Sequence, residues 1–289
     1  MIYGKIGLMR KKLKPIVVIG FFLTFFAIIF ISGVYGNRAT AGKETTITQS
    51  NTNPTSIETI PSSSYYITNA LEMKPIIDVS AWQRPSEIDY DTLSQNISGA
   101  IVRIQSGSHT KNENTATDEN GLDKAFDTHI KEFQARNIPV AVYAYVTGNS
   151  IDSMKEEARS FYEAANKYNP TFYWLDVEEH TMDDMNGGVE AFRQELESLG
   201  AKNIGIYVGT YFMEDHSINV DKFDAIWIPT YGVDSGYYNA APSTDLDYDL
   251  HQYTSRGYVN GFENYLDLNI ITTLKDPNEV YRKLFTTPE

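Results

Sequence analysis

The hydrophobic positions of the chain follow three different patterns. From Ile16 to Tyr35 twenty residues run without a charge, which is long enough for a helix to cross the hydrocarbon core of a bilayer. After it, Ser, Thr and Asn prevail and no apolar period recurs, which is typical of a flexible stalk. Short apolar runs then alternate with amphipathic segments. We therefore expect a signal or transmembrane anchor over 1–36, a disordered Ser/Thr/Asn-rich linker over 37–73 and a folded domain over 74–289.

The charges around the apolar segment predict its orientation. Five basic residues precede it (Lys5, Arg10, Lys11, Lys12 and Lys14), which places the N-terminus in the cytoplasm and the rest of the chain outside. The apolar run is longer than the core of a usual signal peptide, yet Ala39-Thr40-Ala41 is an A-x-A cleavage pattern. An extracytoplasmic domain is expected in either case. It is either a single-pass protein held by its N-terminal segment in the membrane or a protein secreted after cleavage near Ala41.

Seven β-rich runs alternate with helical patterns in the folded domain. Helical stripes cover Leu122–Phe133, Met154–Ala165 and Val189–Leu199, with Ser153 and Glu156 as a possible capping box and Gly200 as a C-cap. The expected strands are Ile76–Ser80, Ala100–Ile104, Val140–Val146, Phe172–Glu178, Ile204–Gly209, Ala225–Tyr231 and Tyr248–Thr254.

This alternation predicts an α/β fold with a mostly parallel sheet. Seven or eight strands without a linker midway favour a closed, TIM-like β/α barrel. An open doubly wound sheet is the alternative. No G-x-G-x-x-G or G-x-x-x-x-G-K-[ST] motif follows any of the runs, so the sequence offers no support for nucleotide binding.

Composition and charge exclude several classes of function. The chain has no Cys, so disulfides, thiolate metal sites and a cysteine nucleophile are excluded. The formal net charge is −14, and six of the 24 Lys and Arg residues lie in residues 1–42, which contain no Asp or Glu. All 38 acidic residues therefore belong to the rest of the chain. Because nucleic-acid binding depends on neutralising phosphates with Lys and Arg, DNA and RNA are poor partner candidates.

Asp176 and Glu178 end one of the apolar runs, Phe172–Glu178. Side chains alternate along a strand, so both carboxylates and Trp174 are expected on one face. When two partly buried carboxylates lie close together, the pKa of one of them is raised. One acid is then protonated beside one that is ionised. Glycosidic bond hydrolysis needs such a pair, with Glu178 as proton donor and an ionised Asp176 to stabilise positive charge. A salt-bridged or solvated strand end is the competing interpretation.

Two further acids and a set of aromatic residues strengthen the hydrolase interpretation. Asp78 and Asp267 each lie in an apolar run, where a barrel would gather its catalytic groups. Flat aromatic rings suit the apolar faces of sugars, and Tyr hydroxyls suit sugar substituents. The aromatic residues in or beside the expected strand ends are Trp82, Tyr143, Tyr145, Trp174, Tyr207, Trp227, Tyr231 and Tyr253.

At these residues the sequence resembles glycoside hydrolase family 25, the muramidases often called Chalaropsis-type lysozymes. The resemblance covers about residues 74–275 and depends on the order and spacing of its pieces. Those pieces are Ile77-Asp78-Val79-Ser80-Ala81-Trp82-Gln83, Ile138–Tyr145, Trp174-Leu175-Asp176-Val177-Glu178, Ile226–Gly232, Gln252-Tyr253-Thr254-Ser255-Arg256-Gly257 and Asp267-Leu268-Asn269.

The resemblance implies an irregular β/α barrel that cleaves the β-1,4 bond between N-acetylmuramic acid and N-acetylglucosamine in bacterial peptidoglycan. It implies Glu178 as general acid/base, Asp176 as its acidic neighbour, and Asp78 and Asp267 as further active-site acids. In a substrate-assisted route Asp176 would orient the substrate's N-acetyl group, and the sequence leaves retaining and inverting outcomes open. Tyr145, Trp227 and Gln252 become candidate sugar contacts, and no cofactor is implied. One departure is that Arg103–Gly107 contains no acid where many members carry a Glu.

Three alternatives are kept beside the muramidase. Chitinase-like hydrolases also place Asp-x-Glu at a strand end, but Phe172 and Tyr173 stand where further acids would precede the motif. A catalytically inactive wall-binding protein would keep the aromatic residues. Metal catalysis through Asp176, Glu178 and His180 is less favoured, because no pair of His residues has ligand spacing and His180 fits a surface or loop position.

Overall fold

The computed structural model describes residues 69–107 and 114–287. The expected anchor over 1–36 and nearly all of the expected linker lie outside these ranges. Within them, no helix is long and apolar enough to cross a membrane. Residues 69–72 form a helical turn in which Ala70 is buried, so ordered packing starts a few residues before the expected domain boundary at 74.

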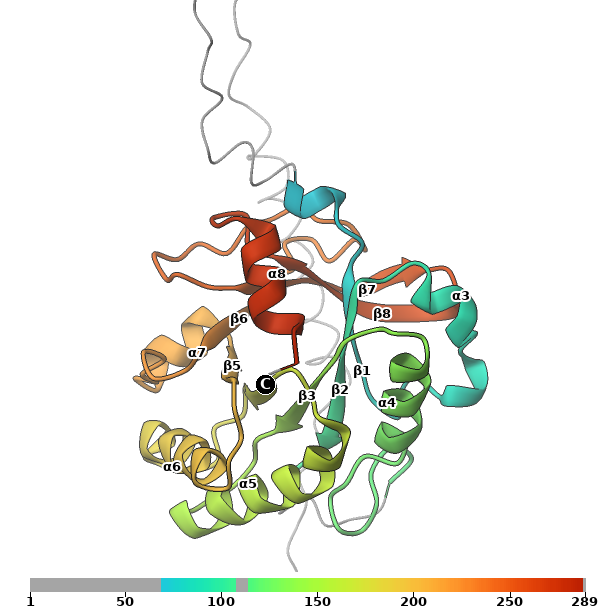
Figure 1. Cartoon of the computed structure of the whole chain (residues 1–289). Helices are drawn as coiled ribbons and strands as arrows, with labels where there is room; N and C mark the ends of the chain where they lie inside the picture. Colours follow the sequence, from blue (N-terminus) through green and yellow to red (C-terminus); the bar gives the residue numbers. More distant parts are fainter. Residues whose placement is uncertain (1–68, 108–113, 288–289) are drawn as a thin grey trace, which may run out of the picture. The chain divides into compact units, whose positions relative to one another are not determined.

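Eight strands close into one barrel in the order of the sequence (Figure 1). The strands β1 to β7 run parallel, whereas β8 is antiparallel to both β7 and β1. The expected closed α/β barrel is therefore confirmed, and its irregularity is the reversed eighth strand. The strands are β1 (Ile76–Val79), β2 (Gly99–Gln105), β3 (Val140–Tyr145), β4 (Tyr173–Val177), β5 (Ile204–Val208), β6 (Ala225–Pro229), β7 (Leu250–Val259) and β8 (Phe262–Ile271).

The strands are apolar on both faces because each face meets its own core. Outward side chains such as Ile77 and Leu175 pack beneath the surrounding helices, while inward ones such as Ile101 and Trp174 fill the barrel. A parallel strand that is buried on both sides reads as an almost continuous hydrophobic run. This is why β1 to β6 were recognisable in the sequence, and why a charged residue within one of these runs needs a functional or structural partner.

The helices cover the outside of the barrel (Figure 1). Two of their expected starts are wrong. The helix expected from Leu122 begins at Phe126, because Leu122 instead forms a bridge with Gln105. The capping box is formed by Ser150 and Ser153 rather than by Ser153 and Glu156. The helices are η1 (Pro85–Glu87), α3 (Tyr90–Ser94), α4 (Phe126–Ala135), α5 (Ile151–Ala165), η2 (Asn166–Tyr168), α6 (Met185–Ser198), α7 (Thr210–Asp215) and α8 (Pro277–Phe285).

The expected end of the third helical stripe is confirmed. Helix α6 ends at Ser198, and Gly200 follows with φ of +96°, a backbone conformation that glycine adopts without strain. The amide of Ala201 donates to the carbonyl of Leu196, which closes the helix end.

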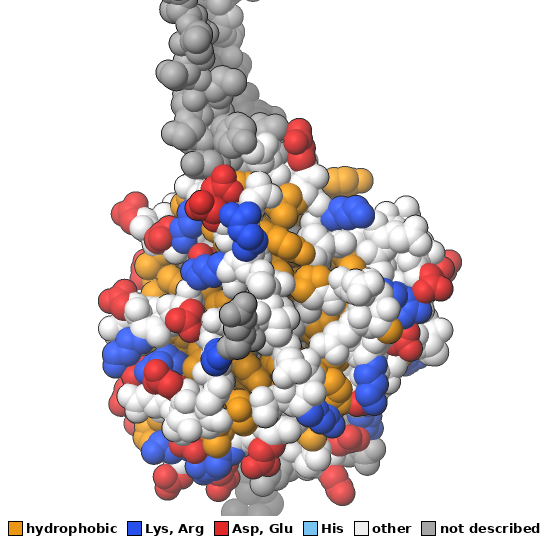
Figure 2. Space-filling model, in the orientation of Figure 1, with side chains coloured by type: hydrophobic (Ala, Val, Ile, Leu, Met, Phe, Trp, Pro, Cys, Tyr) orange, Lys and Arg blue, Asp and Glu red, His pale blue; other side chains and the backbone are white. Residues whose placement is uncertain are grey.

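Helix α8 closes the end of the barrel where the parallel strands begin. The Tyr281 hydroxyl donates to the carbonyl of Ser98, and Lys283 pairs with Asp249, so the helix is fastened beside the starts of β2 and β7. Figure 2 shows this side of the protein, where Lys and Arg side chains are interspersed with Asp and Glu. The opposite end, at the carboxyl ends of the parallel strands, is left for a functional site.

Strands β7 and β8 are longer than the other strands, and the hairpin that they form is fixed at its tip. Gly261 has φ of +105°, and its carbonyl accepts a hydrogen bond from the Asp89 amide at 2.8 Å. A Cβ atom at Gly261 would lie 2.3 Å from the backbone nitrogen of Leu93. Glycine is thus required here both by the turn and by the close approach of the α3 backbone.

We expect Gly261→Ala to lower the free energy of unfolding by about 2 kcal/mol or more, because backbone atoms must shift to admit the methyl group. Gly209→Ala is the matched control, since a Cβ atom at Gly209 would meet nothing within 4 Å. The control should lose less than about 1 kcal/mol. Urea unfolding of both variants measures the difference, and equal losses would contradict this account of the turn.

Candidate active site

A cavity of about 220 Å³ opens at the carboxyl ends of the parallel strands. It brings together the four predicted acids, Gln252 and five of the eight aromatic residues singled out in the sequence. Trp82, Trp174 and Tyr253 do not line it, whereas Arg103 does although it was not predicted. The lining residues are Asp78, Arg103, Tyr143, Tyr145, Asp176, Glu178, Tyr207, Trp227, Tyr231, Gln252 and Asp267.

The pairing of the strands accounts for this gathering. Asp176 of β4 lies level with Tyr145 of β3 on one side and with Tyr207 of β5 on the other. Where the barrel closes, Asp78 of β1 lies level with Asp267 of β8. Opposite residues of neighbouring strands have Cβ atoms about 5 Å apart, so register alone brings these groups close together.

Asp78 is the acceptor at the centre of a buried hydrogen-bond network. Its Oδ2 atom accepts from Gln252 Nε2 at 2.9 Å and from Asn269 Nδ2 at 2.8 Å. Trp227 Nε1 in turn donates to Asn269 Oδ1 at 2.8 Å. The hydroxyl of Tyr207 donates to Gln252 Oε1 at 2.9 Å. Gln252 and Asn269 thus donate directly to Asp78 and favour its ionised form, while Trp227 and Tyr207 donate to these two amides and hold them in place.

Burial and crowding keep one acid of this pair protonated. Desolvation raises the pKa of Asp267 to about 8, with a further contribution from the charge of Asp78. Desolvation also raises the pKa of Asp78 to about 6, although hydrogen bonds from Asn269, Gln252 and Asp267 oppose the shift. Near neutral pH the pair therefore consists of an ionised Asp78 that accepts a hydrogen bond from a protonated Asp267.

Asp176 is buried, and its Oδ1 atom has no hydrogen-bond partner among the residues that the structure describes. Desolvation raises its pKa well above the usual range, and the charges of Glu178 and Asp78 add to the shift while Arg103 opposes it. Burial therefore opposes the ionised form of Asp176 that the sequence analysis expects, and the nearby guanidinium of Arg103 favours it. A donor group on a bound ligand would both satisfy Oδ1 and favour the charged form.

Glu178 follows the last residue of β4 and is exposed at the mouth of the cavity. Desolvation on the side that faces the protein raises its pKa, as do the charges of Asp78 and Glu179. Beside it, the hydroxyl of Tyr145 donates to Glu179 Oε2 at 3.2 Å, which leaves Glu178 as the acid that faces the cavity. A solvent-accessible carboxyl with a raised pKa is suited to donate and recover a proton.

Arg103 is the functional residue that the sequence analysis missed. Its Nε and Nη2 atoms contact Asp123 Oδ2 at 3.0 and 2.9 Å, and the same oxygen accepts from the Ala81 amide. Asp123 is fully buried and fixes the guanidinium in the cavity wall. A charge in the middle of the apolar run Ala100–Ile104 was the available signal, since such a charge is rarely buried without a partner.

The predicted sugar contact at Trp174 is wrong. Its side chain is 1% exposed, stacks on Phe172 at 5.0 Å and meets Trp227 edge-on at 5.6 Å. The residue shares the inward face with Asp176 as expected, but it lies one layer deeper in the barrel. It supports the cavity floor from below and cannot contact a ligand.

Other candidates from the sequence lie away from the cavity lining. Trp82 is 60% exposed beyond the end of β1, and Tyr253 packs against the core between barrel and helices. His180 is exposed and its ring stacks on that of His216 at 4.5 Å. In the described ranges no group of three or more His, Asp or Glu side chains has the geometry of a metal site.

A closed β/α barrel with carboxyl groups of different pKa at its strand ends has the arrangement of a glycoside hydrolase. Comparison with known families agrees, since the sequence profile of the glycosyl hydrolases family 25 matches residues 77–262. The chain belongs to glycosyl hydrolase family 25.

Solved structures give the same result. One is described as a glycosyl hydrolase 25 of Streptococcus pneumoniae, the virulence factor GHIP participating in host cell invasion, with 58% identity over 78% of this chain and 98% of that chain (TM-score 0.73). Another is the catalytic domain of the endolysin ply40 from bacteriophage P40 of Listeria monocytogenes, with 25% identity over 72% and 97% (TM-score 0.62). The bacterial lysozyme of Streptomyces coelicolor, at 18% identity over 75% and 99%, shares the fold (TM-score 0.59). No curated protein sequence matches the chain.

The raised pKa of Asp267 predicts a pH-dependent stability. Its folded-state value of about 8 lies above the ordinary 3.8, so the folded protein retains a proton that the unfolded chain releases. Stability from this group is therefore lost as the pH rises from about 4 to about 8.

Asp267→Asn keeps a donor toward Asp78 but cannot ionise. The free energy of unfolding should fall between pH 5 and pH 8 in the original protein, and the fall should be smaller in the variant by at least about 1.4 kcal/mol. Urea unfolding at both pH values measures this, and parallel losses would contradict the assignment.

Proposed function

We propose that the protein is a muramidase that cleaves the β-1,4 bond between N-acetylmuramic acid and N-acetylglucosamine in bacterial peptidoglycan, with Glu178 as general acid/base. The observation that carries the proposal is the single cavity in which Glu178, Asp176, Asp78 and Asp267 meet among Tyr and Trp side chains. Membership of family 25 supports it, as does the 58% identity with a glycosyl hydrolase 25 of known structure.

Glu178 begins the reaction by donating its proton to the glycosidic oxygen as the bond to the anomeric carbon breaks. The raised pKa keeps a protonated fraction available, and exposure at the cavity mouth allows exchange with water. In the second half of the reaction the Glu178 carboxylate removes a proton from the attacking water. One carboxyl group thus serves as acid and then as base.

Asp176 is the partner of the substrate's N-acetyl group. Asp176 lines the cavity, and the acetamido N–H of the sugar can donate to its carboxylate there. That hydrogen bond favours the Asp176 carboxylate and offsets its raised pKa. The acetamido carbonyl oxygen is thereby oriented to attack the anomeric carbon, and the charge that develops on the acetamido group is stabilised by Asp176.

Asp78 supplies a fixed negative charge nearby. It cannot rotate freely because Gln252 and Asn269 hold its carboxylate, and the Tyr207 hydroxyl holds Gln252. Such preorganised charge stabilises an oxocarbenium-like transition state without reorganisation during the reaction. Asp267, kept protonated by desolvation and by the charge of Asp78, donates to Asp78 rather than acting as a second base.

Mass analysis of the soluble fragments released from purified peptidoglycan tests the bond that is cut. Fragments that end in reducing N-acetylmuramic acid are expected, whereas chitin should be left intact. Release from chitin with intact peptidoglycan would favour the chitinase-like alternative. Binding to the wall without any new reducing ends would instead favour an inactive wall-binding protein.

Glu178→Gln removes the proton donor while keeping the shape of the side chain. We expect kcat to fall about 10²- to 10⁴-fold, which is the usual contribution of a general acid, with KM nearly unchanged. The neighbouring Glu179→Gln is the matched control, and its kcat should change less than about 10-fold because this group bonds to Tyr145 instead of lining the cavity. Equal losses in the two variants would remove Glu178 from its assigned role.

We further propose that the catalytic domain acts outside the cytoplasm and depends on the membrane segment predicted over 1–36 for its placement. The support is the charge pattern of the sequence, with five basic residues before the twenty-residue apolar run. Fractionation of cells that express the full chain, followed by protease treatment of intact spheroplasts, tests this. Digestion of the domain at the cell surface is expected, and a protected domain would contradict the proposal.

A further inference from the structure

The β7–β8 hairpin carries three exposed side chains in mutual contact, Arg256, Tyr258 and Tyr265, which we call the outer platform. The rings of Tyr258 and Tyr265 are 65% and 43% exposed, and their centroids lie 4.8 Å apart. The guanidinium carbon of Arg256 lies 5.0 Å from the centroid of the Tyr265 ring, and its Nη2 donates to the Tyr265 hydroxyl at 3.3 Å. Large exposed rings clustered in this way are typical of a binding surface.

The outer platform continues the face of the sheet that carries the catalytic acids. Leu266 is fully buried in the core between barrel and helices, so its neighbours Tyr265 and Asp267 point to the other face of β8. Asp267 on that face lines the catalytic cavity. Tyr265 follows two positions further out, about 7 Å along the strand. A polymer that leaves the cavity along β8 therefore meets the outer platform.

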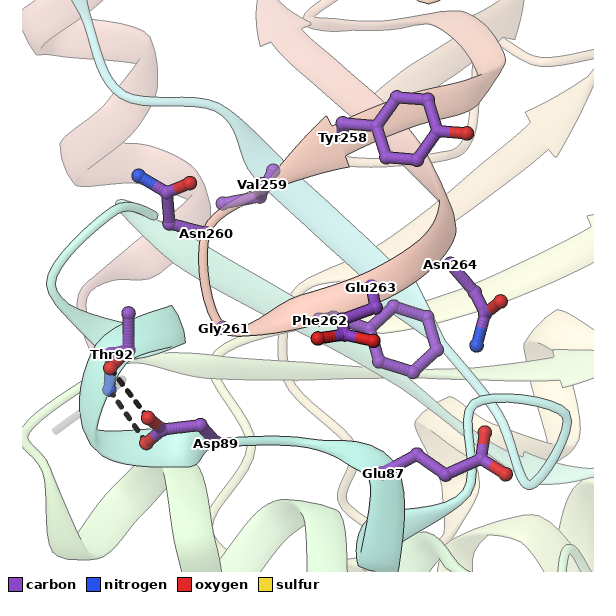
Figure 3. A pocket seen from close by; sticks show the side chains of 10 residues that line it. All are labelled: Glu87, Asp89, Thr92, Tyr258, Val259, Asn260, Gly261, Phe262, Glu263 and Asn264. Carbon is purple, nitrogen blue, oxygen red and sulfur yellow. Dashed lines mark hydrogen bonds between the residues drawn. The ribbon is translucent and has the colours of Figure 1, made fainter.

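The hairpin holds this platform in a fixed position. Its opposite face buries Val259 and Phe262, and Phe262 forms a bridge with Ile88. Between the tip and the segment 87–92 lies a hollow of about 710 Å³, shown in Figure 3. In that view the Tyr258 ring points away from Asp89, whose carboxylate is engaged with the amide and hydroxyl of Thr92.

Tyr258 belongs to the outer platform and also lines the hollow, but the charged residues of the two differ. Glu87, Asp89 and Glu263 line the hollow, so it would repel an acidic ligand. On the platform, by contrast, Arg256 makes no ion pair within the described ranges, and Asp234 attracts it only at longer range. An exposed guanidinium held beside an aromatic ring is well placed to bind a carboxylate from outside the protein. Exposed rings at the same place fit the apolar face of a sugar.

We propose that Arg256, Tyr258 and Tyr265 form an outer subsite for the peptidoglycan strand, in which the tyrosines contact a sugar beyond the cleaved bond and Arg256 binds a carboxylate of the peptide that the strand carries. The proposal rests on the proposed function and extends it to the class of substrate preferred, since the subsite favours long, peptide-bearing strands over short fragments.

Kinetics on three substrates test the subsite: peptide-bearing glycan strands, the same strands after enzymatic removal of the peptides, and a peptide-free tetrasaccharide. For the double variant Tyr258→Ala, Tyr265→Ala we expect KM to rise about 10-fold on both kinds of strand, with kcat nearly constant and the tetrasaccharide unaffected. For Arg256→Ala we expect KM to rise about 5-fold on peptide-bearing strands alone.

Leu274→Ala and Arg282→Ala are the matched controls, because both residues are exposed beyond the other end of the barrel. They should leave KM unchanged on every substrate. If the double variant unfolds, the single change Tyr258→Ser at the more exposed ring gives the same comparison with a smaller effect. Unchanged KM on the strands, or an equal rise on the tetrasaccharide, would overturn the subsite. Failure of the original protein to cleave any strand would instead overturn the proposed function.

Discussion

Four carboxyl groups that share a cavity of about 220 Å³ cannot all be ionised, and the rest of the site depends on how that repulsion is resolved. The hydrogen bonds from Gln252 and Asn269 favour the charged form of Asp78, while desolvation and the charge of Asp78 raise the pKa of Asp267. Asp176 is buried beside two other acids, and both desolvation and their charges favour its protonated form. Glu178 is the most exposed of the four acids and can exchange protons with solvent during a catalytic cycle.

The barrel brings these carboxyl groups together and remains stable in spite of their repulsion. Closure of β8 against β1 brings Asp267 level with Asp78, and the parallel pairing of β3, β4 and β5 places Asp176 between two tyrosines. Burial of the acids lowers the stability of the folded protein, and the hydrophobic layers below and around the site offset this loss. The same reversed strand that closes the barrel continues outward into the hairpin, so one element connects the catalytic acids with the proposed outer subsite.

Much of the fold and site was predictable because buried parallel strands read as apolar runs and side chains alternate along them. This pattern was enough to bring Asp176 and Glu178 to one cavity with Asp78. Alternation gives the face of a residue but not its depth, and for that reason Trp174 was misplaced. The position of Arg103 depends on Asp123, which is distant in the sequence. The protonation of Asp176 depends on desolvation by the protein that surrounds it in the fold. The antiparallel direction of β8 likewise has no local signal in its residues.

The central claim is that the site holds at least one carboxyl protonated above neutral pH beside one that is charged. Carbon-13 NMR titration of the side-chain carboxyls, on the unliganded protein and on Asp267→Asn, measures this directly. The account predicts a carboxyl resonance that titrates near pH 8 and disappears in the variant, with the Asp78 resonance titrating near pH 6 in the original protein. If every active-site carboxyl titrated below pH 5, the shared-proton arrangement and the acid roles built on it would be contradicted.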